Sequence, residues 1–153
     1  MSADGRYRYQ LTRRWAPGPG ICFVMLNPST ADADVDDPTI RRCMAFGRAW
    51  GYGSLIVVNL FALRATHPSD LLKVPFAERI GPQNDRWILR AHVASDRSVA
   101  AWGNHRAIGD RDRDVIRLLD AELDHMALTK GGRPRHPLYL KGSSPVAKWT
   151  PGT

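Results

Sequence analysis

Three polar residues have side chains that can act on a ligand: Asn27, Asn59 and His136. The amide of Asn27 can accept a hydrogen bond from a water molecule and orient it without carrying a charge. The amide of Asn59 offers both a donor and an acceptor, which is what reading the edge of a nucleobase requires. His136 can donate a hydrogen bond to a leaving group whose negative charge grows in the transition state.

Each of the three residues also has a purely structural interpretation. Asn27 begins an Asn-Pro-Ser-Thr run, which is typical of a turn and a helix cap. Asn59 could be a buried amide that is satisfied by backbone groups, and His136 a solvated residue of a surface loop. The residue types alone leave both interpretations open. The positions of these residues relative to the predicted strands and helices are therefore needed to choose between them.

Apolar runs alternate with helix signals along the chain. The predicted strands are largely apolar and span residues 21–26, 54–60, 98–102 and 126–129. The first of them is a continuous apolar run, which predicts a strand that is buried on both faces. The predicted helices span about 38–50, 82–92 and 110–123. An alternating segment at 7–12 and a Pro-Gly turn predict a hairpin with the first buried strand. The expected fold is a single α/β domain with a mostly parallel four-stranded central sheet flanked by helices and an N-terminal antiparallel hairpin.

The candidate residues stand at the ends of these predicted strands. Asn27 follows the first buried strand, Asn59 ends the second, Trp102-Gly103 closes the third, and the fourth leads to His136. Ligands of parallel α/β sheets bind beyond the carboxyl ends of the strands. Polar clusters at four strand ends would therefore converge on one crevice.

Composition excludes several other classes of protein. The 153 residues are enough for one domain with a real core, and no apolar run approaches the roughly 18 residues of a membrane span. Cys22 and Cys43 are too few for a disulfide framework or an iron–sulfur cluster, and the five histidines lack paired metal-ligand spacing. With no apolar signal segment at the polar N-terminus, we expect a cytoplasmic protein without membrane, metal or cofactor.

The chain is basic, with 22 Lys plus Arg against 15 Asp plus Glu and a formal charge of +7. Neutralisation of phosphates by such side chains dominates affinity for nucleic acid, which makes nucleic acid a candidate partner. A basic surface that is merely solvated is the alternative. If the charge serves binding, the basic residues beside the candidate loops should share a face with Asn27 and Asn59. These residues are Arg41, Arg42, Arg133, Arg135 and Lys141.

A set of short motifs from about Tyr7 to Leu140 resembles a bacterial family known as domain of unknown function 1643. The motifs are Met25–Ser29, Asp37–Thr39, Trp50–Gly53, Val58–Thr66, Gly81–Asp85, Ala101–Gly103 and Arg135–Tyr139. They are specific and cover nearly the whole chain. This resemblance implies a family but no activity.

At lower specificity, the order of these landmarks is similar to that of the uracil-DNA glycosylase superfamily. That superfamily has a water-positioning Asp or Asn followed by Pro after its first strand, an Asn after the second, a Trp-Gly after the third and a His-Pro after the fourth. The resemblance implies Asn27 as the water-positioning catalytic residue and His136 as the group that stabilises the departing base. It also implies Asn59 as the base-reading amide.

The same resemblance implies contacts around the reacting base. Pro28 and Ser29 would lie with Asn59 in the base-binding site. Leu138 or Tyr139 would be the wedge that fills the gap left by an extruded base. Basic residues around the crevice would hold the flanking phosphates.

The expected function is therefore that of a metal-independent N-glycosidic hydrolase that removes a modified, damaged or mismatched base, as in DNA repair. Residues 1–153 would form one uracil-DNA-glycosylase-like domain, with DNA as its expected partner and a monomer as its expected state. Two alternatives stay open. One is a non-catalytic module that binds nucleic acid, and the other is a hydrolase that acts on free nucleosides or nucleotides.

Overall fold

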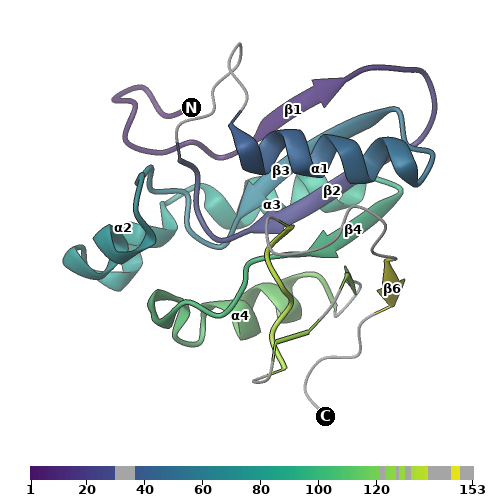
Figure 1. The fold of residues 1–153 in the computed structure, drawn as a ribbon. Helices are drawn as coiled ribbons and strands as arrows, with labels where there is room; N and C mark the ends of the chain where they lie inside the picture. The colour runs from purple at the N-terminus through teal and green to yellow at the C-terminus, as the bar shows by residue number, and fades with distance from the viewer. Residues whose placement is uncertain (30–36, 121–122, 127, 130–131, 138–145, 149–153) are drawn as a thin grey trace.

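A single mixed sheet forms the centre of the protein in the computed structural model (Figure 1). The structure describes residues 1–29, 37–120, 123–126, 128–129, 132–137 and 146–148. Among them, six strands lie in the spatial order β1-β3-β2-β4-β5-β6. The strands span Leu11–Arg14 (β1), Gly20–Met25 (β2), Ser54–Asn59 (β3), Arg97–Ala100 (β4), Asp124–His125 (β5) and Ala147–Lys148 (β6).

The direction of the strands changes at both edges of the sheet. The pairings β3–β2, β2–β4 and β4–β5 are parallel, whereas β1 is antiparallel to β3 and β6 is antiparallel to β5. Strand β2 lies in the middle, and its residues from Ile21 to Val24 are fully buried. This burial on both faces explains why β2 is an uninterrupted apolar run in the sequence.

Helices cover both faces of the sheet and make three layers. The α-helices span Pro38–Ala49 (α1), Phe76–Ile80 (α2), Asn84–Ala94 (α3) and Arg111–Leu118 (α4), and 3₁₀ helices span Pro68–Lys73 (η1) and Arg106–Ile108 (η2). One core cluster joins α1 to residues of the sheet such as Phe23 and Val57. A second cluster joins α3 and α4 to the other face, where Val24 and Val58 lie. In Figure 1, α1 lies in front of the sheet and α3 behind it.

The start of α1 follows from its sequence. Asp37 is the N-cap, and its Oδ1 accepts a hydrogen bond of 2.8 Å from the backbone N–H of Ile40. Pro38 occupies the first turn, where its missing N–H costs nothing. Ile40, Cys43 and Phe46 are then spaced to face the sheet. Asp37 therefore lies at the amino end of α1. Figure 1 shows that this end of the helix is on the side of the sheet where β2 ends.

The prediction of an α/β domain with a single sheet and flanking helices is confirmed, but its detail is wrong in three respects. The sheet has six described strands instead of four, and antiparallel strands stand at both edges. The N-terminal strand pairs with β3 and not with β2, so 7–12 and 21–26 do not form a hairpin. The predicted fourth strand at 126–129 is also displaced, because the strand lies at Asp124–His125.

Gly53 explains why the predicted hairpin between the first two strands does not form. The backbone N–H groups of Trp15 and Ala16 both donate to the carbonyl of Gly53, and Gly53 donates to the carbonyl of Pro19. A Cβ at this position would come within 2.4 Å of the Ala16 carbonyl oxygen. The glycine therefore lets β3 approach the β1–β2 connection closely and insert between the two strands.

No helix in the described part of the chain is both long and apolar enough to cross a lipid bilayer.

Candidate functional site

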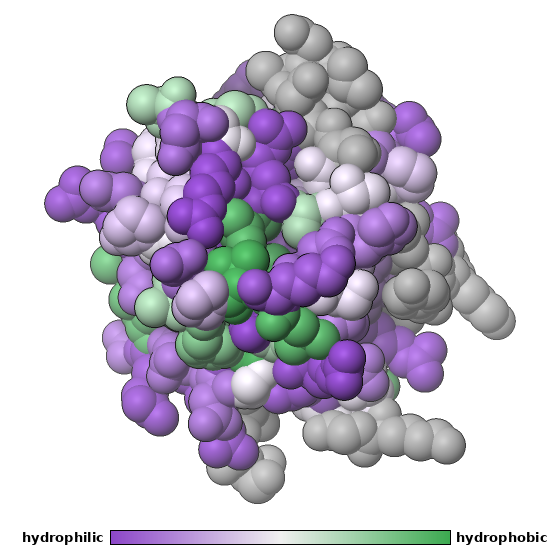
Figure 2. Space-filling view, turned by 90° about the vertical axis from the view of Figure 1, so that its left-hand side faces the viewer, coloured by the Kyte–Doolittle hydropathy of each residue, from purple (hydrophilic) through white to green (hydrophobic). Residues whose placement is uncertain are grey.

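A cavity of about 730 Å³ lies at the carboxyl ends of the central strands. Figure 2 shows the side of the molecule on which these strands end, and hydrophobic residues lie there within a rim of hydrophilic ones. The lining residues come from the ends of β2 and β3, from the segments after β2, β3 and β4, from the start of α1, from the segment that carries His136 and from Arg8 before β1. Those with polar side chains include Arg8, Asn27, Ser29, Asp37, Asn59, Asn104, His105, Arg135 and His136. The structure thus brings Asn27, Asn59 and His136 together in one cavity.

Asn27 is held in a fixed orientation directly after β2. Its Nδ2 donates to the carbonyl of Pro28 at 3.0 Å and to the carbonyl of Ala65 at 2.9 Å. Two carbonyl acceptors require the NH2 group on this side of the amide. The Oδ1 atom accepts no hydrogen bond from the described residues, so it can accept one from a water molecule or a ligand. Pro28 and Ser29 line the same cavity.

Asn59 is 3% exposed at the end of β3, and its side chain lines the cavity. None of the described residues forms a hydrogen bond with its side-chain amide. Hydrogen bonds from the fully buried Asn84 fix the backbone at this position. Asn84 Nδ2 donates to the carbonyls of Asn59 at 2.9 Å and Leu60 at 3.1 Å. Asn84 begins α3, so the helix fixes the strand end that presents Asn59.

His136 is partly buried in the cavity wall, and this burial lowers its pKa to about 4. The cause is desolvation of the imidazolium, and the negative charge of Asp37 acts in the opposite direction. The imidazole is therefore neutral near pH 7 and has one N–H to donate. In that state His136 can donate this N–H to a departing anion as its negative charge grows.

The low pKa of His136 predicts a pH dependence of stability. Between about pH 4 and pH 6.5 the unfolded chain binds a proton at His136 and the folded chain does not, so the free energy of unfolding falls as the pH falls. His136→Gln should reduce this fall. Urea unfolding of both proteins at pH 7 and pH 5 measures it, with His67→Gln, at an exposed position, as the control. An equal fall in wild type and His136→Gln would contradict the assigned shift.

The predicted basic residues occupy different environments. Arg135 is exposed and lines the cavity, and Arg41 is exposed on α1. Arg42 ties α1 to the segment of His136, since its Nε donates to the carbonyl of Pro137 at 3.4 Å. A nucleic-acid contact by any of these residues stays a prediction.

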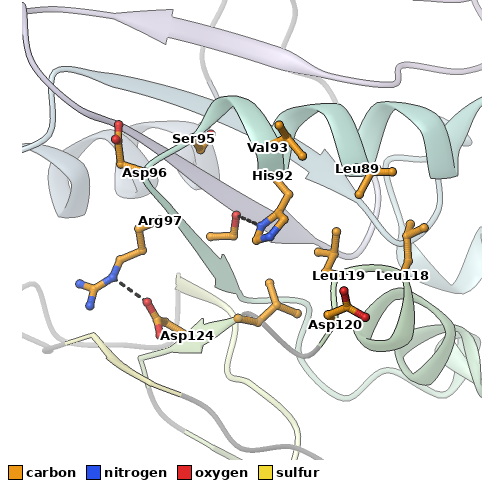
Figure 3. A pocket seen from close by; sticks show the side chains of 12 residues that line it. Leu89, His92, Val93, Ser95, Asp96, Arg97, Leu118, Leu119, Asp120 and Asp124 are labelled. Carbon is orange, nitrogen blue, oxygen red and sulfur yellow. Dashed lines mark hydrogen bonds and ion pairs between the residues drawn. The ribbon is translucent and has the colours of Figure 1, made fainter.

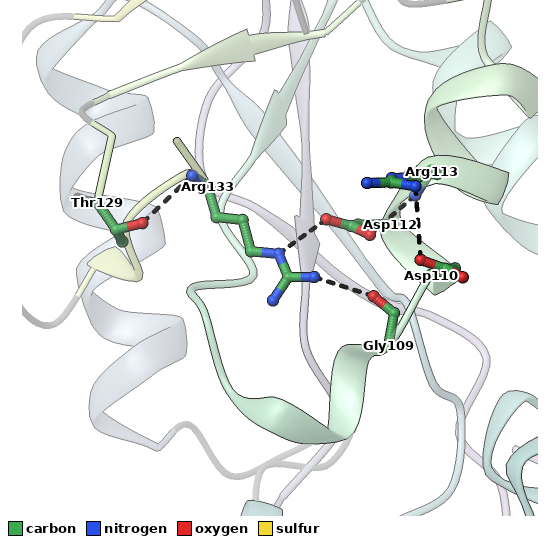
Figure 4. A network of polar contacts seen from close by, with 6 residues as sticks. All are labelled: Gly109, Asp110, Asp112, Arg113, Thr129 and Arg133. Atoms are coloured by element: carbon green, nitrogen blue, oxygen red, sulfur yellow. Dashed lines mark hydrogen bonds and ion pairs between the residues drawn. The ribbon is translucent and has the colours of Figure 1, made fainter. Parts of the chain in front are cut away.

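Arg133 forms two side-chain contacts within the protein that the sequence did not indicate. Its Nε donates to Asp112 Oδ2 at 3.0 Å and its Nη2 donates to the Gly109 carbonyl at 2.9 Å (Figure 4). The Asp112 side chain is 10% exposed and that of Arg133 is 30% exposed, so the ion pair is only partly shielded from water. The pair joins the segment before His136 to the start of α4 and so supports the position of that segment. The other three predicted contact residues, Leu138, Tyr139 and Lys141, lie outside the described residues.

Arg8 and Asp37 are two of the cavity-lining residues that the sequence analysis did not assign to the site. Arg8 is 5% exposed and lines the cavity, beside the end of β3, where its N–H donates to the carbonyl of Ala62. No local signal marked Arg8, because alternation with the apolar side chains of Tyr7 and Tyr9 predicts an exposed arginine. In the sequence, Asp37 stood out only as part of the Asp37–Thr39 motif, although it lines the cavity as well.

A second cavity, of about 700 Å³, lies at the amino end of β4 (Figure 3). It contains an ion pair between Arg97 Nε and Asp124 Oδ2 at 2.6 Å and a contact of 2.7 Å between His92 Nδ1 and Ser98 Oγ. None of the predicted site residues that the structure describes lines it. The candidate site is therefore the cavity at the carboxyl ends of the strands.

The described residues contain no group of three or more His, Cys, Asp or Glu side chains that could hold a metal ion. Both cysteines are buried in the core. Burial raises the pKa of Cys22 to about 12 and raises that of Cys43 further. Both are thus thiols near pH 7 and poor nucleophiles.

Comparison with known proteins identifies the family of the chain. No curated protein and no solved structure matches it. Residues 8–138 match the family model described as "Protein of unknown function (DUF1643)", and this range includes Asn27, Asn59 and His136. The chain therefore belongs to the DUF1643 family.

Proposed function

We propose that this protein is an N-glycosidic hydrolase that removes a modified, damaged or mismatched base from nucleic acid, with DNA as its partner. The observation that carries the proposal is the convergence of Asn27, Asn59 and His136 on one cavity at the carboxyl ends of the strands. The cavity volume lies within the range of small-ligand pockets. The similarity of the motif order to that of the uracil-DNA glycosylase superfamily supports the same reaction.

Each of the three residues has a separate task in the proposed reaction. Asn59 reads the edge of the base with its amide donor and acceptor. Asn27 holds a water molecule through Oδ1, and His136 donates a hydrogen bond to the departing base as its negative charge grows. The target nucleotide is flipped out of a duplex or taken from a single strand, because a stacked base cannot reach the cavity. Arg135 and Arg41 supply positive charge for the flanking phosphates.

The experiment that tests the proposal is incubation of the purified protein with oligonucleotides that carry uracil, mismatched, deaminated or alkylated bases. Abasic sites are then scored in single and double strands. We expect abasic sites from at least one substrate. Salt-dependent binding without abasic sites would instead favour a non-catalytic module. Release from free nucleosides alone, with little salt dependence, would favour a small-molecule hydrolase.

Asn27→Ala is expected to lower the single-turnover rate about 100-fold and to leave the affinity for the oligonucleotide nearly unchanged. The reason is that a misplaced water costs transition-state stabilisation, whereas the phosphate contacts that dominate affinity remain. Rapid-quench assays and binding titrations measure the two quantities. Asn104→Ala is the matched control, since Asn104 is an exposed asparagine that lines the same cavity. An equal loss in both variants would contradict the role of Asn27.

A further inference from the structure

A buried carboxylate shares the cavity with the three residues discussed above. Asp37 is 8% exposed and lines the cavity. Among the described residues, it is the one carboxylate in the cavity lining. The carboxylate therefore stands within the space in which the proposed reaction takes place, and His136 is close enough to be influenced by its charge.

The carboxylate is held on both oxygens. Oδ1 accepts from the Ile40 N–H at 2.8 Å, and Oδ2 accepts from the Ser29 hydroxyl at 2.8 Å. The amino end of α1, with its positive dipole end, favours a negative charge at this position. Each carboxylate oxygen can accept more than one hydrogen bond, so the group can still contact a ligand or a water molecule.

A negative group can assist the proposed reaction in two ways that the neutral amide of Asn27 cannot. Cleavage of an N-glycosidic bond passes through an oxocarbenium-like sugar, which carries positive charge at its anomeric carbon. The attacking water must also lose a proton. An amide orients water but remains neutral and does not take up that proton.

We propose that Asp37 is the catalytic carboxylate of this site, an inference that rests on the proposed function. The water oxygen forms a bond to the anomeric carbon while the bond from that carbon to the base nitrogen breaks. The electron pair of the broken bond leaves with the base, which accepts a hydrogen bond from His136. One proton of the water passes to Asp37, which later releases it to solvent or to the base. The products are a sugar with an anomeric hydroxyl and a free base.

The decisive variant removes the charge of Asp37 and keeps its structural role. Asparagine is as good an N-cap as aspartate, so Asp37→Asn retains an acceptor for the Ile40 N–H. We expect an approximately 100-fold lower single-turnover rate with an unchanged midpoint of urea unfolding. Thr39→Ala is the control, because Thr39 lines the same cavity in the first turn of α1 and carries no charge. We expect it to lower the rate less than fivefold.

Asp37→Gly with added formate provides an independent readout. Glycine is tolerated at an N-cap, and the missing side chain leaves room for a small carboxylate. Formate should restore part of the lost rate in Asp37→Gly and leave the wild-type rate unchanged. A rate loss without formate rescue, together with a lower unfolding midpoint, would assign only a capping role to Asp37 and overturn the inference.

The outcomes separate this inference from the proposed function. Base release by the wild type and equal release by Asp37→Asn would overturn the role of Asp37 and leave the glycosidic hydrolase intact. Absence of base release by the wild type from every substrate would overturn both. Release by the wild type, loss in Asp37→Asn and rescue by formate would support both.

Discussion

Replacing His136 with alanine is expected to lower the single-turnover rate of base release by about 10²–10³-fold. Removal of one preorganised hydrogen-bond donor from a developing anion typically has an effect of this size. Because burial keeps the imidazole neutral near pH 7, the lost contact is an N–H donor and not a positive charge. Rapid-quench kinetics at saturating protein measures the effect.

Two further variants define the role of His136. His136→Gln keeps an N–H donor and should recover part of the rate. His105→Ala is the matched control, since His105 also lines the cavity and its Nδ1 accepts from the Ala107 N–H at 3.0 Å. If His136→Ala releases base at the wild-type rate, or if His105→Ala loses as much, His136 does not stabilise the leaving base.

Replacing Phe23 with alanine is expected to lower the free energy of unfolding by about 3–5 kcal/mol. Phe23 is fully buried in the middle of β2, and its ring stacks on Trp50 with centroids 6.1 Å apart. Truncation removes apolar contacts and leaves a cavity between the sheet and α1. Urea unfolding of wild type and variant measures the change.

Phe76→Ala is the matched control for this prediction. The same side chain is removed, but Phe76 is 39% exposed in α2 and packs edge-on against Phe61. We expect a distinctly smaller loss of stability than for Phe23→Ala. Equal losses in the two variants would contradict the assignment of the core to the two faces of the sheet.

The parts of the fold that depend on local signals were predictable from the sequence. The Asp37-Pro38 pair marks the start of α1, and the apolar runs mark β2 and β3 because these strands are buried on both faces. Because ligands of parallel sheets bind beyond the carboxyl ends of the strands, Asn27 and Asn59 were expected at the same edge of the sheet. Both line the same cavity there. Their roles in chemistry stay predictions.

Long-range pairing could not be predicted in the same way. Strand β1 pairs with β3, a choice that depends on the close approach of Gly53 to Ala16, which lies 37 positions earlier in the chain. Arg133, a predicted nucleic-acid contact, pairs with Asp112 at the start of α4, which no local pattern indicates. The cavity-facing position of Arg8 likewise follows from its place beside the end of β3. Such contacts join segments whose proximity no local pattern encodes.

The central claim is that the base occupies the cavity at the carboxyl ends of the strands and is released there. The most direct test is mass-spectrometric detection of free base after a single turnover by the wild type and by Ala65→Phe. Ala65 lines the cavity, so phenylalanine should fill it while Asn27, Asp37 and His136 remain. We predict free base from the wild type and none from Ala65→Phe in its folded state. No free base from the wild type on any substrate, or equal release by both proteins, would contradict the account.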